Sequence, residues 1–155
     1  MRRDDREVTS VEGIFDILSR CDTMHLAMND EGSPYVIPMT FGCEMENGSI
    51  VVYFHSAAAG HKYELLAKDP RVTVEASLYY QVKRTDDGAV TARYESVIGR
   101  GTAELLTEQA DKVAALKCML AHYKESGFPV TSCKGLAQVA AFRVRLDTVT
   151  GKHNL

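Results

Sequence analysis

The sequence predicts a mainly β domain of the α+β class, in which about six antiparallel strands form a small barrel with peripheral helices. Three observations predict this fold. Short apolar stretches alternate with turn signals along most of the chain, whereas helical spacing of apolar residues is confined to three segments. In addition, one long extended segment carries two glycines, which is typical of strands that bend at the corner of a barrel.

The length of 155 residues predicts a single domain spanning residues 1–155. Hydrophobic residues make up 45% of the chain and the net charge is −3. A weakly acidic chain without clustered Lys and Arg is a poor nucleic-acid binder, so we expect no nucleic-acid partner. The charged first residues are followed by no apolar run, and no segment is long and apolar enough to cross a membrane. We therefore expect a cytoplasmic protein with no membrane association.

Three segments are predicted to be helical. The first runs over about 10–20 and begins with a capping box formed by Thr9 and Glu12. The second covers about 60–67, and the third follows Thr107, which we expect to cap it. The apolar residues of the third helix recur at spacings of three and four and predict a buried stripe. They are Val113, Leu116, Leu120 and Tyr123.

The first half of the chain predicts a three-stranded antiparallel meander over 24–55. Its strands are Met24–Met28, Tyr35–Cys43 and Val51–His55, and the pair Asn47-Gly48 favours a tight hairpin before the last of them. Proline cannot donate to a strand ladder, so Pro38 predicts a sheet edge or an interruption within the middle strand.

The second half of the chain predicts three further strands, at Val72–Tyr80, Thr91–Leu106 and Val139–Leu146. The second of these is the long one, and Gly99 and Gly101 indicate a bend or bulge within it. The last strand alternates apolar and other residues and closes the sheet.

The four cysteines are Cys21, Cys43, Cys118 and Cys133, and their spacing fits no zinc motif, so we expect no bound metal. We expect reduced thiols packed in the core, although the even number leaves a disulfide open.

The histidines give no catalytic constellation. His25, His122 and His153 have no partner that spacing can assign, and nothing in the spacing supports a dyad of His55 with Cys43.

The segment from Tyr53 to Lys62 carries the most chemical information. A strand ends there, small residues follow, and a helix begins near Gly60. Free N–H groups at a helix N-terminus suit a phosphate, and Ser56, His61 and Lys62 could add a hydroxyl and cationic groups. The alternative is an ordinary strand-to-helix loop with an exposed lysine.

Two other segments could line a ligand. The backbone of 34–41 could face a flat ring, with a hydroxyl from Thr40; the alternative is a buried strand with a kink. In the stretch 93–101, one face of the strand presents Tyr94, Ser96 and Ile98. That face could line a pocket or a dimer seam, or simply lie on the surface at a barrel corner.

Taken together, these segments resemble a known family. The motifs occur in order along nearly the whole chain: MRRDDRE, PYVIPMTFGCE, YFHSAxxGxK, LLxxDPxV, SVIGxG, ALxxMxxHY and TGK. Their order and spacing are similar to those of the 5-nitroimidazole-resistance (Nim-type) group within the pyridoxamine 5′-phosphate oxidase-like superfamily.

This resemblance implies a split barrel that binds FMN at the interface of a homodimer. It implies that Ser56 and Lys62, with His61 as a further candidate, hold the phosphate, and that Ala57 is a further cofactor-binding residue. It also implies that His55 lies beside the flavin as the candidate catalytic residue. The partner subunit is implied to contribute from the long strand. The ring-lining residues so implied are Ile37, Pro38, Met39, Thr40 and Phe41, with Tyr94, Ser96 and Val97 approaching the flavin.

Two residues depart from the pattern of the family. His61 stands where Lys or Arg is more common, and Thr40 stands where Asn is more common. A histidine carries less positive charge at neutral pH, so phosphate affinity is expected to be weaker or pH-dependent.

The sequence leaves three functions open. The first is an FMN-dependent oxidoreductase, similar to nitroreductases, that passes electrons to a small acceptor such as a nitroimidazole or quinone. The second is a flavin carrier or redox sensor without turnover, because no acid–base constellation is present. The third is a split barrel that holds haem or a deazaflavin in place of FMN, with His55 as a conceivable axial ligand of the haem. Pyridoxamine phosphate oxidation itself is not expected, because no second Arg-rich phosphate site is found.

Overall fold

A computed structural model describes residues 3–125, 127–132 and 135–155 and contains eight strands in these ranges. They form one antiparallel sheet in the order β3-β2-β6-β7-β8-β5-β4, and β1 pairs with the far part of β8. In the described residues β3 and β4, the two ends of this order, do not pair with each other, so the barrel stays open. The strands are β1 (Glu7–Val8), β2 (Met24–Asp30), β3 (Ser33–Met39), β4 (Gly42–Glu46), β5 (Ser49–Ala57), β6 (Arg71–Arg84), β7 (Val90–Leu106) and β8 (Val139–Asn154).

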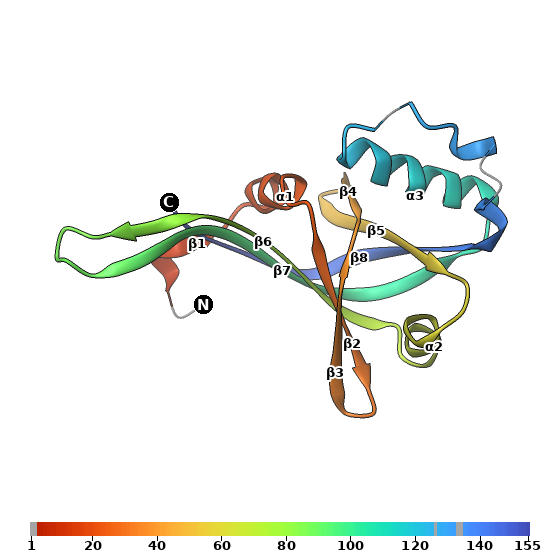
Figure 1. Ribbon diagram of the computed structural model, residues 1–155, viewed down its shortest axis with the longest axis horizontal. Helices are drawn as coiled ribbons and strands as arrows, with labels where there is room; N and C mark the ends of the chain where they lie inside the picture. Colours follow the sequence, from red (N-terminus) through yellow and green to blue (C-terminus); the bar gives the residue numbers. More distant parts are fainter. Residues whose placement is uncertain (1–2, 126, 133–134) are drawn as a thin grey trace.

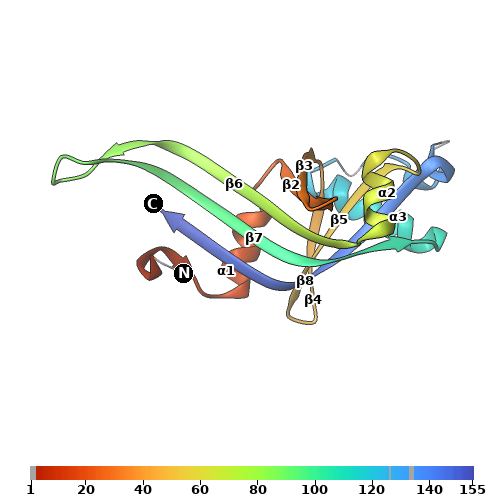
Figure 2. The same ribbon diagram turned by 90° about the horizontal axis from the view of Figure 1, so that it is seen from below.

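The helices lie at the periphery of the sheet, as predicted. Figure 1 shows α1 (Val11–Ser19) and α3 (Gln109–His122) on the same side of the long strands, with α2 (His61–Lys68) near the end of β5. In the view from below, β6 and β7 continue beyond the body of the protein as a long curved arm (Figure 2). Short 3₁₀ turns lie at Asp4–Arg6, Val130–Ser132 and Leu136–Gln138. Within the described ranges, no helix combines the length and apolar character needed to span a bilayer.

The predicted meander over 24–55 is wrong. The chain leaves β3 after Met39 and begins β4 at Gly42, so the expected middle strand is divided in two. The halves belong to separate hairpins, since β3 pairs with β2 and β4 pairs with β5. Contacts between distant segments determine that these two halves pair at opposite ends of the sheet, and the local sequence does not predict such contacts. This division and the short β1 account for eight strands instead of six.

Local turn chemistry is confirmed. Asn47 and Gly48 both have positive φ, 50° and 77°, and they join Glu46 to its partner Ser49 in a two-residue hairpin loop. Pro38 lies in β3, which is an end strand of the sheet and therefore needs no second set of ladder bonds.

The long strand β7 bends near Gly99 and Gly101, as predicted. The register between β7 and β8 shifts at Arg100 and Gly101, as in a β-bulge. A Cβ at Gly101 would lie 2.2 Å from the carbonyl oxygen of Arg145, so no other residue fits this close approach. Beyond the bulge, β8 continues to Asn154 instead of ending at Leu146, because it keeps pairing with β7 while its polar residues face outward.

Two predicted helix caps are wrong. Ser10, not Thr9, is the N-cap of α1, and its Oγ accepts a hydrogen bond of 3.1 Å from the N–H of Gly13. Glu108 replaces Thr107 at the start of α3 and makes no side-chain cap bond. In both cases the observed cap is the next residue along the chain. The sequence pattern alone does not fix the start of a helix to within one residue.

The main core lies between the sheet and α1, and a smaller cluster lies under α3. The stripe predicted on α3 is displaced, because the fully buried residues of this helix are Ala115 and Met119. The largest buried side chains of the protein are Phe41, Phe54, Ile17, Leu18, Met24, Leu26, Ile50, Val51, Val52, Val74, Val97 and Val144.

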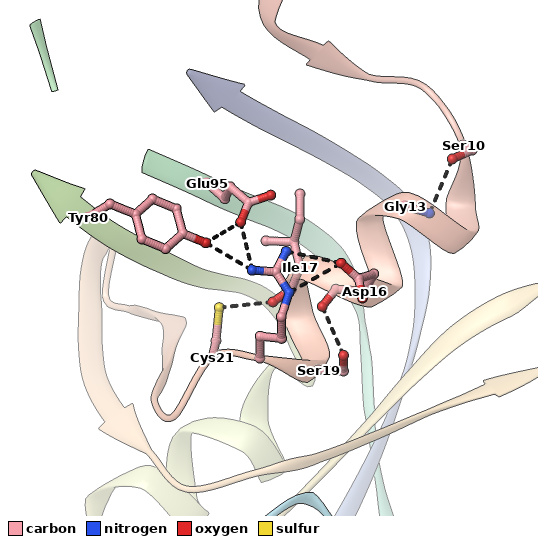
Figure 3. Close-up of polar contacts among 9 residues, drawn as sticks. Ser10, Gly13, Asp16, Ile17, Ser19, Cys21, Tyr80 and Glu95 are labelled. Carbon is pink, nitrogen blue, oxygen red and sulfur yellow. Dashed lines mark hydrogen bonds and ion pairs between the residues drawn. The ribbon is translucent and has the colours of Figure 1, made fainter. Parts of the chain in front are cut away.

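A half-buried ion pair fastens the end of α1 to the base of the arm (Figure 3). Nη1 of Arg20 donates to Oε2 of Glu95 at 2.7 Å, and the Glu95 side chain is only 9% exposed. The hydroxyl of Tyr80 also donates to Glu95, and Asp16 accepts from Nη2 of Arg20 at 3.0 Å. Hydrogen bonds from Arg20 lower the pKa of Glu95, so this carboxylate is held in its charged form.

We predict that Arg20→Met reduces the free energy of unfolding at pH 7 by about 1–2 kcal/mol, because Glu95 is left without its cation. The folded pKa of Glu95 is lowered from 4.5. The contribution of the pair is therefore present above that value and is lost as pH falls through the folded pKa. Urea unfolding from pH 7 down to pH 3 measures it.

Arg71→Met is the matched control, because Arg71 pairs with Asp69 while its own side chain is 80% exposed. An equal loss in the two variants, or a loss for Arg20→Met that persists at pH 3, would contradict the proposed role of the Arg20–Glu95 pair.

Candidate functional site

Four of the predicted site residues meet between the end of β3, the end of β5 and the start of α2. Nζ of Lys62 lies 3.2 Å from Sδ of Met39, which joins α2 to β3. Lys62 is also close enough to His55 to influence its ionisation. His55 and Thr40 line the same cavity. The structure therefore brings together residues that lie more than twenty positions apart in the sequence.

Lys62 is a half-buried cation at the N-terminus of a helix. Among the described residues its Nζ has no carboxylate partner, and burial lowers its pKa. Gly60 caps this helix with φ 100°, a left-handed conformation that favours glycine, and the space where its Cβ would stand is open. The N-terminus of a helix, an ammonium without a carboxylate partner among the described residues, and open space together make this a candidate anion site.

The other predicted phosphate ligands are partly engaged. The hydroxyl of Ser56 donates to the carbonyl oxygen of Ala57 at 2.7 Å. Nε2 of His61 lies 2.8 Å from Oδ2 of Asp30, and its ring meets the edge of Tyr35 with centroids 5.0 Å apart. His61 is therefore directed toward the β2–β3 hairpin, whereas Lys62 carries the free charge.

His55 is held in its neutral form. Burial, and secondly the positive charge of Lys62, lower its pKa. Its Nδ1 is buried and has no hydrogen-bond partner in the part of the chain that the structure describes. A neutral imidazole with an unsatisfied ring nitrogen is typical of residues whose partner is a ligand.

An apolar cavity of about 480 Å³ opens beside His55 and Thr40. Its other walls come from the second half of α3 and from the segment that follows this helix. The lining residues are Thr40, His55, Leu116, Met119, Leu120, Tyr123, Phe128, Pro129, Val130 and Ser132.

The hydroxyl of Tyr123 fixes the segment between β3 and β4. It accepts a 3.1 Å hydrogen bond from the N–H of Phe41 and donates one of 2.8 Å to the carbonyl oxygen of Asp22. A Cβ at Gly42 would lie 2.6 Å from the backbone nitrogen of Met119, so α3 rests directly on the start of β4. The position of Thr40 thus depends on α3.

The remaining ring-lining candidates lie along the end strand β3 and the link that follows it. Ile37 and Met39 are half-buried, Pro38 is exposed, and Phe41 is buried in the core. As an end strand, β3 leaves one row of backbone groups free of ladder bonds. The backbone of this segment, more than its side chains, is therefore available to a flat ligand.

The three candidates on β7 lie apart from this cluster. Tyr94 packs against Lys152 of β8, whose Nζ is 5.8 Å from the ring centroid. Ser96 is half-buried, and the side chain of Val97 is 1% exposed within the core. An approach of these residues to a ligand bound on a partner subunit stays a prediction.

The cysteines of the described residues are free thiols, and Cys133 lies outside these residues. Nδ1 of His122 lies 3.7 Å from Sγ of Cys43, while its Nε2 lies 2.8 Å from the carbonyl oxygen of Cys21. Since a carbonyl only accepts, Nε2 carries the proton and Nδ1 accepts from the thiol. Burial raises the pKa of Cys43 to about 12, so this pair is structural and not nucleophilic.

Sequence reasoning missed the cavity. Leu116, Leu120 and Tyr123 were predicted to be a buried stripe, and the structure shows them lining an open space. An apolar stripe has the same pattern whether it faces a core or a ligand cavity. Phe128 and Val130 lie in a segment without periodicity, which gave no signal for a wall of the site.

Comparison with known proteins identifies the family. Residues 10–153 match the family model described as pyridoxamine 5′-phosphate oxidase, and the chain belongs to this family. None of the curated proteins matches this sequence.

Solved structures confirm the split-barrel fold and the resemblance predicted from the sequence. A candidate 5-nitroimidazole antibiotic resistance protein from Bacteroides thetaiotaomicron is 28% identical with a TM-score of 0.82, over 94% of this chain and 85% of that one. The flavocytochrome Anf3 from Azotobacter vinelandii is 22% identical with a TM-score of 0.79, over 100% and 72%. A FAD- and haem-binding protein from Mycobacterium smegmatis is 20% identical with a TM-score of 0.80, over 96% and 73%.

We predict that Tyr123→Phe lowers the free energy of unfolding by about 1–2 kcal/mol, because the N–H of Phe41 and the carbonyl of Asp22 both lose their partner. Tyr53→Phe is the matched control, since its hydroxyl makes one bond to the exposed carboxylate of Glu44. Denaturant titration followed by circular dichroism measures both. Equal losses in the two variants would show that the two hydrogen bonds of the Tyr123 hydroxyl stabilise the protein no more than the single exposed bond of Tyr53.

Proposed function

We propose that this protein is an FMN-binding oxidoreductase that reduces a small acceptor. The observation that carries the proposal is Lys62, a half-buried ammonium without a carboxylate partner among the described residues, placed at the N-terminus of α2 beside a neutral His55. A buried cation is costly unless an anion compensates it. Family membership makes a flavin phosphate the natural anion.

The phosphate would be held by Lys62, the hydroxyl of Ser56 and backbone N–H groups at the start of α2 and in the loop before it. The hydroxyl of Ser56 can turn from the carbonyl of Ala57, its present acceptor, toward a phosphate oxygen. Because Asp30 engages His61, we assign this histidine to positioning the loop and not to the phosphate.

The isoalloxazine ring would lie along the free backbone edge from Ile37 to Thr40, with His55 beside it. Bound there, the flavin would supply reversible transfer of two electrons between a nicotinamide nucleotide and the acceptor. His55 is neutral and can offer a hydrogen bond to the ring without adding charge. The hydroxyl of Thr40 offers a second polar contact from the link after β3.

Haem is the second ligand to consider, because two structural relatives bind it and His55 has an unsatisfied Nδ1. The cavity beside His55 argues against it, since none of its described lining residues is an Arg or Lys that could neutralise haem propionates. The free charge lies at Lys62 instead, where a phosphate fits.

We propose a homodimer as the working form, as the resemblance implies. The arm formed by β6 and β7 supports this proposal, because Tyr79, Val82 and Val90 expose 61–66% of their surface along it. Apolar side chains on a projecting hairpin are typical of a surface that a second subunit covers.

We predict that FMN binds at least tenfold more tightly than riboflavin, because only FMN carries the phosphate that Lys62 recognises. Lys62→Met should weaken FMN binding by about tenfold or more and leave riboflavin binding nearly unchanged. Quenching of flavin fluorescence measures both affinities. Lys68→Met, at the exposed C-terminal end of the same helix, is the control. Equal affinities for FMN and riboflavin would contradict the phosphate site.

A steady-state assay separates an enzyme from a flavin carrier. We expect the loaded protein to oxidise NADH or NADPH continuously when a nitroimidazole or quinone is present. Bleaching of the flavin without turnover of any acceptor would instead identify a carrier or redox sensor.

A further inference from the structure

The cavity on the α3 side differs in chemistry from the phosphate half of the site. Its lining combines aliphatic, aromatic and thioether side chains, and none of its described residues carries a fixed charge. Lys62, the nearest unpaired cation described above, points to Met39 and is not part of the lining. An anionic ligand placed in this cavity would therefore lose its hydration with no cation to replace it.

The few polar groups of the lining are neutral. They are the hydroxyl of Thr40, the imidazole of His55 and the hydroxyl of Ser132, which donates to the carbonyl oxygen of Pro129 at 3.2 Å. Tyr123 offers a ligand only its ring, because its hydroxyl is already hydrogen-bonded to the backbone of Phe41 and Asp22. An apolar chamber whose lining includes the hydroxyl of Thr40 and the neutral imidazole of His55 suits a small carbonyl compound with an otherwise apolar body.

The side chains of the lining favour a flat ring. Tyr123 and Phe128 offer aromatic surfaces and Met119 offers a polarisable sulfur. Phe128 is 62% exposed although it is large and apolar. A side chain of this kind at the rim of a cavity gains burial when a ligand arrives.

We propose that this cavity is the acceptor site and that it selects a neutral, apolar, fused-ring carbonyl compound of the naphthoquinone class. The inference rests on the proposed function, because the cavity adjoins Thr40 and His55, where the flavin ring is placed. It excludes phosphorylated and other anionic acceptors from the same chamber.

The test compares two quinones of almost equal shape. The first, 2,3-dimethyl-1,4-naphthoquinone, is neutral, and the second, 2-hydroxy-3-methyl-1,4-naphthoquinone, is ionised at pH 7.5. Isothermal titration calorimetry on the purified protein should show at least tenfold tighter binding of the neutral compound. Equal or tighter binding of the anion would overturn the proposal.

Leu120→Lys adds an ammonium at the cavity and should reverse this preference, because a cation there attracts the anion whether it points inward or reaches the rim. Ala121→Lys places the same group on the neighbouring exposed position of α3 and should leave the preference unchanged. Equal shifts in both variants would show that the quinones bind elsewhere.

A second variant keeps the test valid if Leu120→Lys fails to fold. Phe128→Ala removes an exposed ring and should weaken binding of the neutral quinone several-fold, whereas Leu105→Ala, at an exposed apolar residue of β7 outside the cavity lining, should not. Equal effects of the two variants would count against the cavity.

The visible spectrum of the same samples separates a failure of the proposed flavin binding from a failure of the proposed acceptor site. A flavin-containing protein without preference for the neutral quinone overturns the inference and leaves the proposed function intact. A protein that binds no flavin overturns the proposed function, and with it the acceptor role of the cavity.

Discussion

The hydroxyl of Tyr123 holds together the three parts of the chain on which the site depends. It connects α3 to the segment between β3 and β4 through the N–H of Phe41, and to the start of β2 through the carbonyl of Asp22. The open barrel needs such a bridge, because β3 and β4 lie at opposite ends of the sheet and do not pair in the described residues. The same bridge positions Thr40 and turns the ring of Tyr123 into the cavity.

The site has two halves of opposite character. At the start of α2, an unpaired ammonium and free backbone groups favour an anion, and burial makes that preference strong. Beneath α3, an apolar chamber without fixed charge in its described lining favours a neutral ring. His55 lies between the two halves and is kept neutral by burial and by Lys62. A phosphorylated planar cofactor that hands electrons to an apolar acceptor fits this division.

Local chemistry made much of the fold predictable. Backbone preferences of nearby residues are enough to predict the Asn47-Gly48 turn, the bend near Gly101 and the three helices. The placement of β3 and β4 at opposite ends of the sheet could not be predicted, because it depends on contacts between distant segments. For the site, motif resemblance pointed to His55 and Lys62, whereas the cavity wall at Leu116 and Leu120 was indistinguishable from core. The contact of His61 with Asp30 could likewise not be predicted from the spacing of residues, because the two are 31 positions apart.

The most direct test of the central claim is the visible absorption spectrum of the purified protein, with the mass of any chromophore released on denaturation. We expect the two absorption bands of an oxidised flavin and the release of FMN. A Soret band would assign the site to haem and make His55 its ligand. A colourless protein that also fails to bind added FMN would contradict the proposed flavin site and leave the charge of Lys62 unexplained.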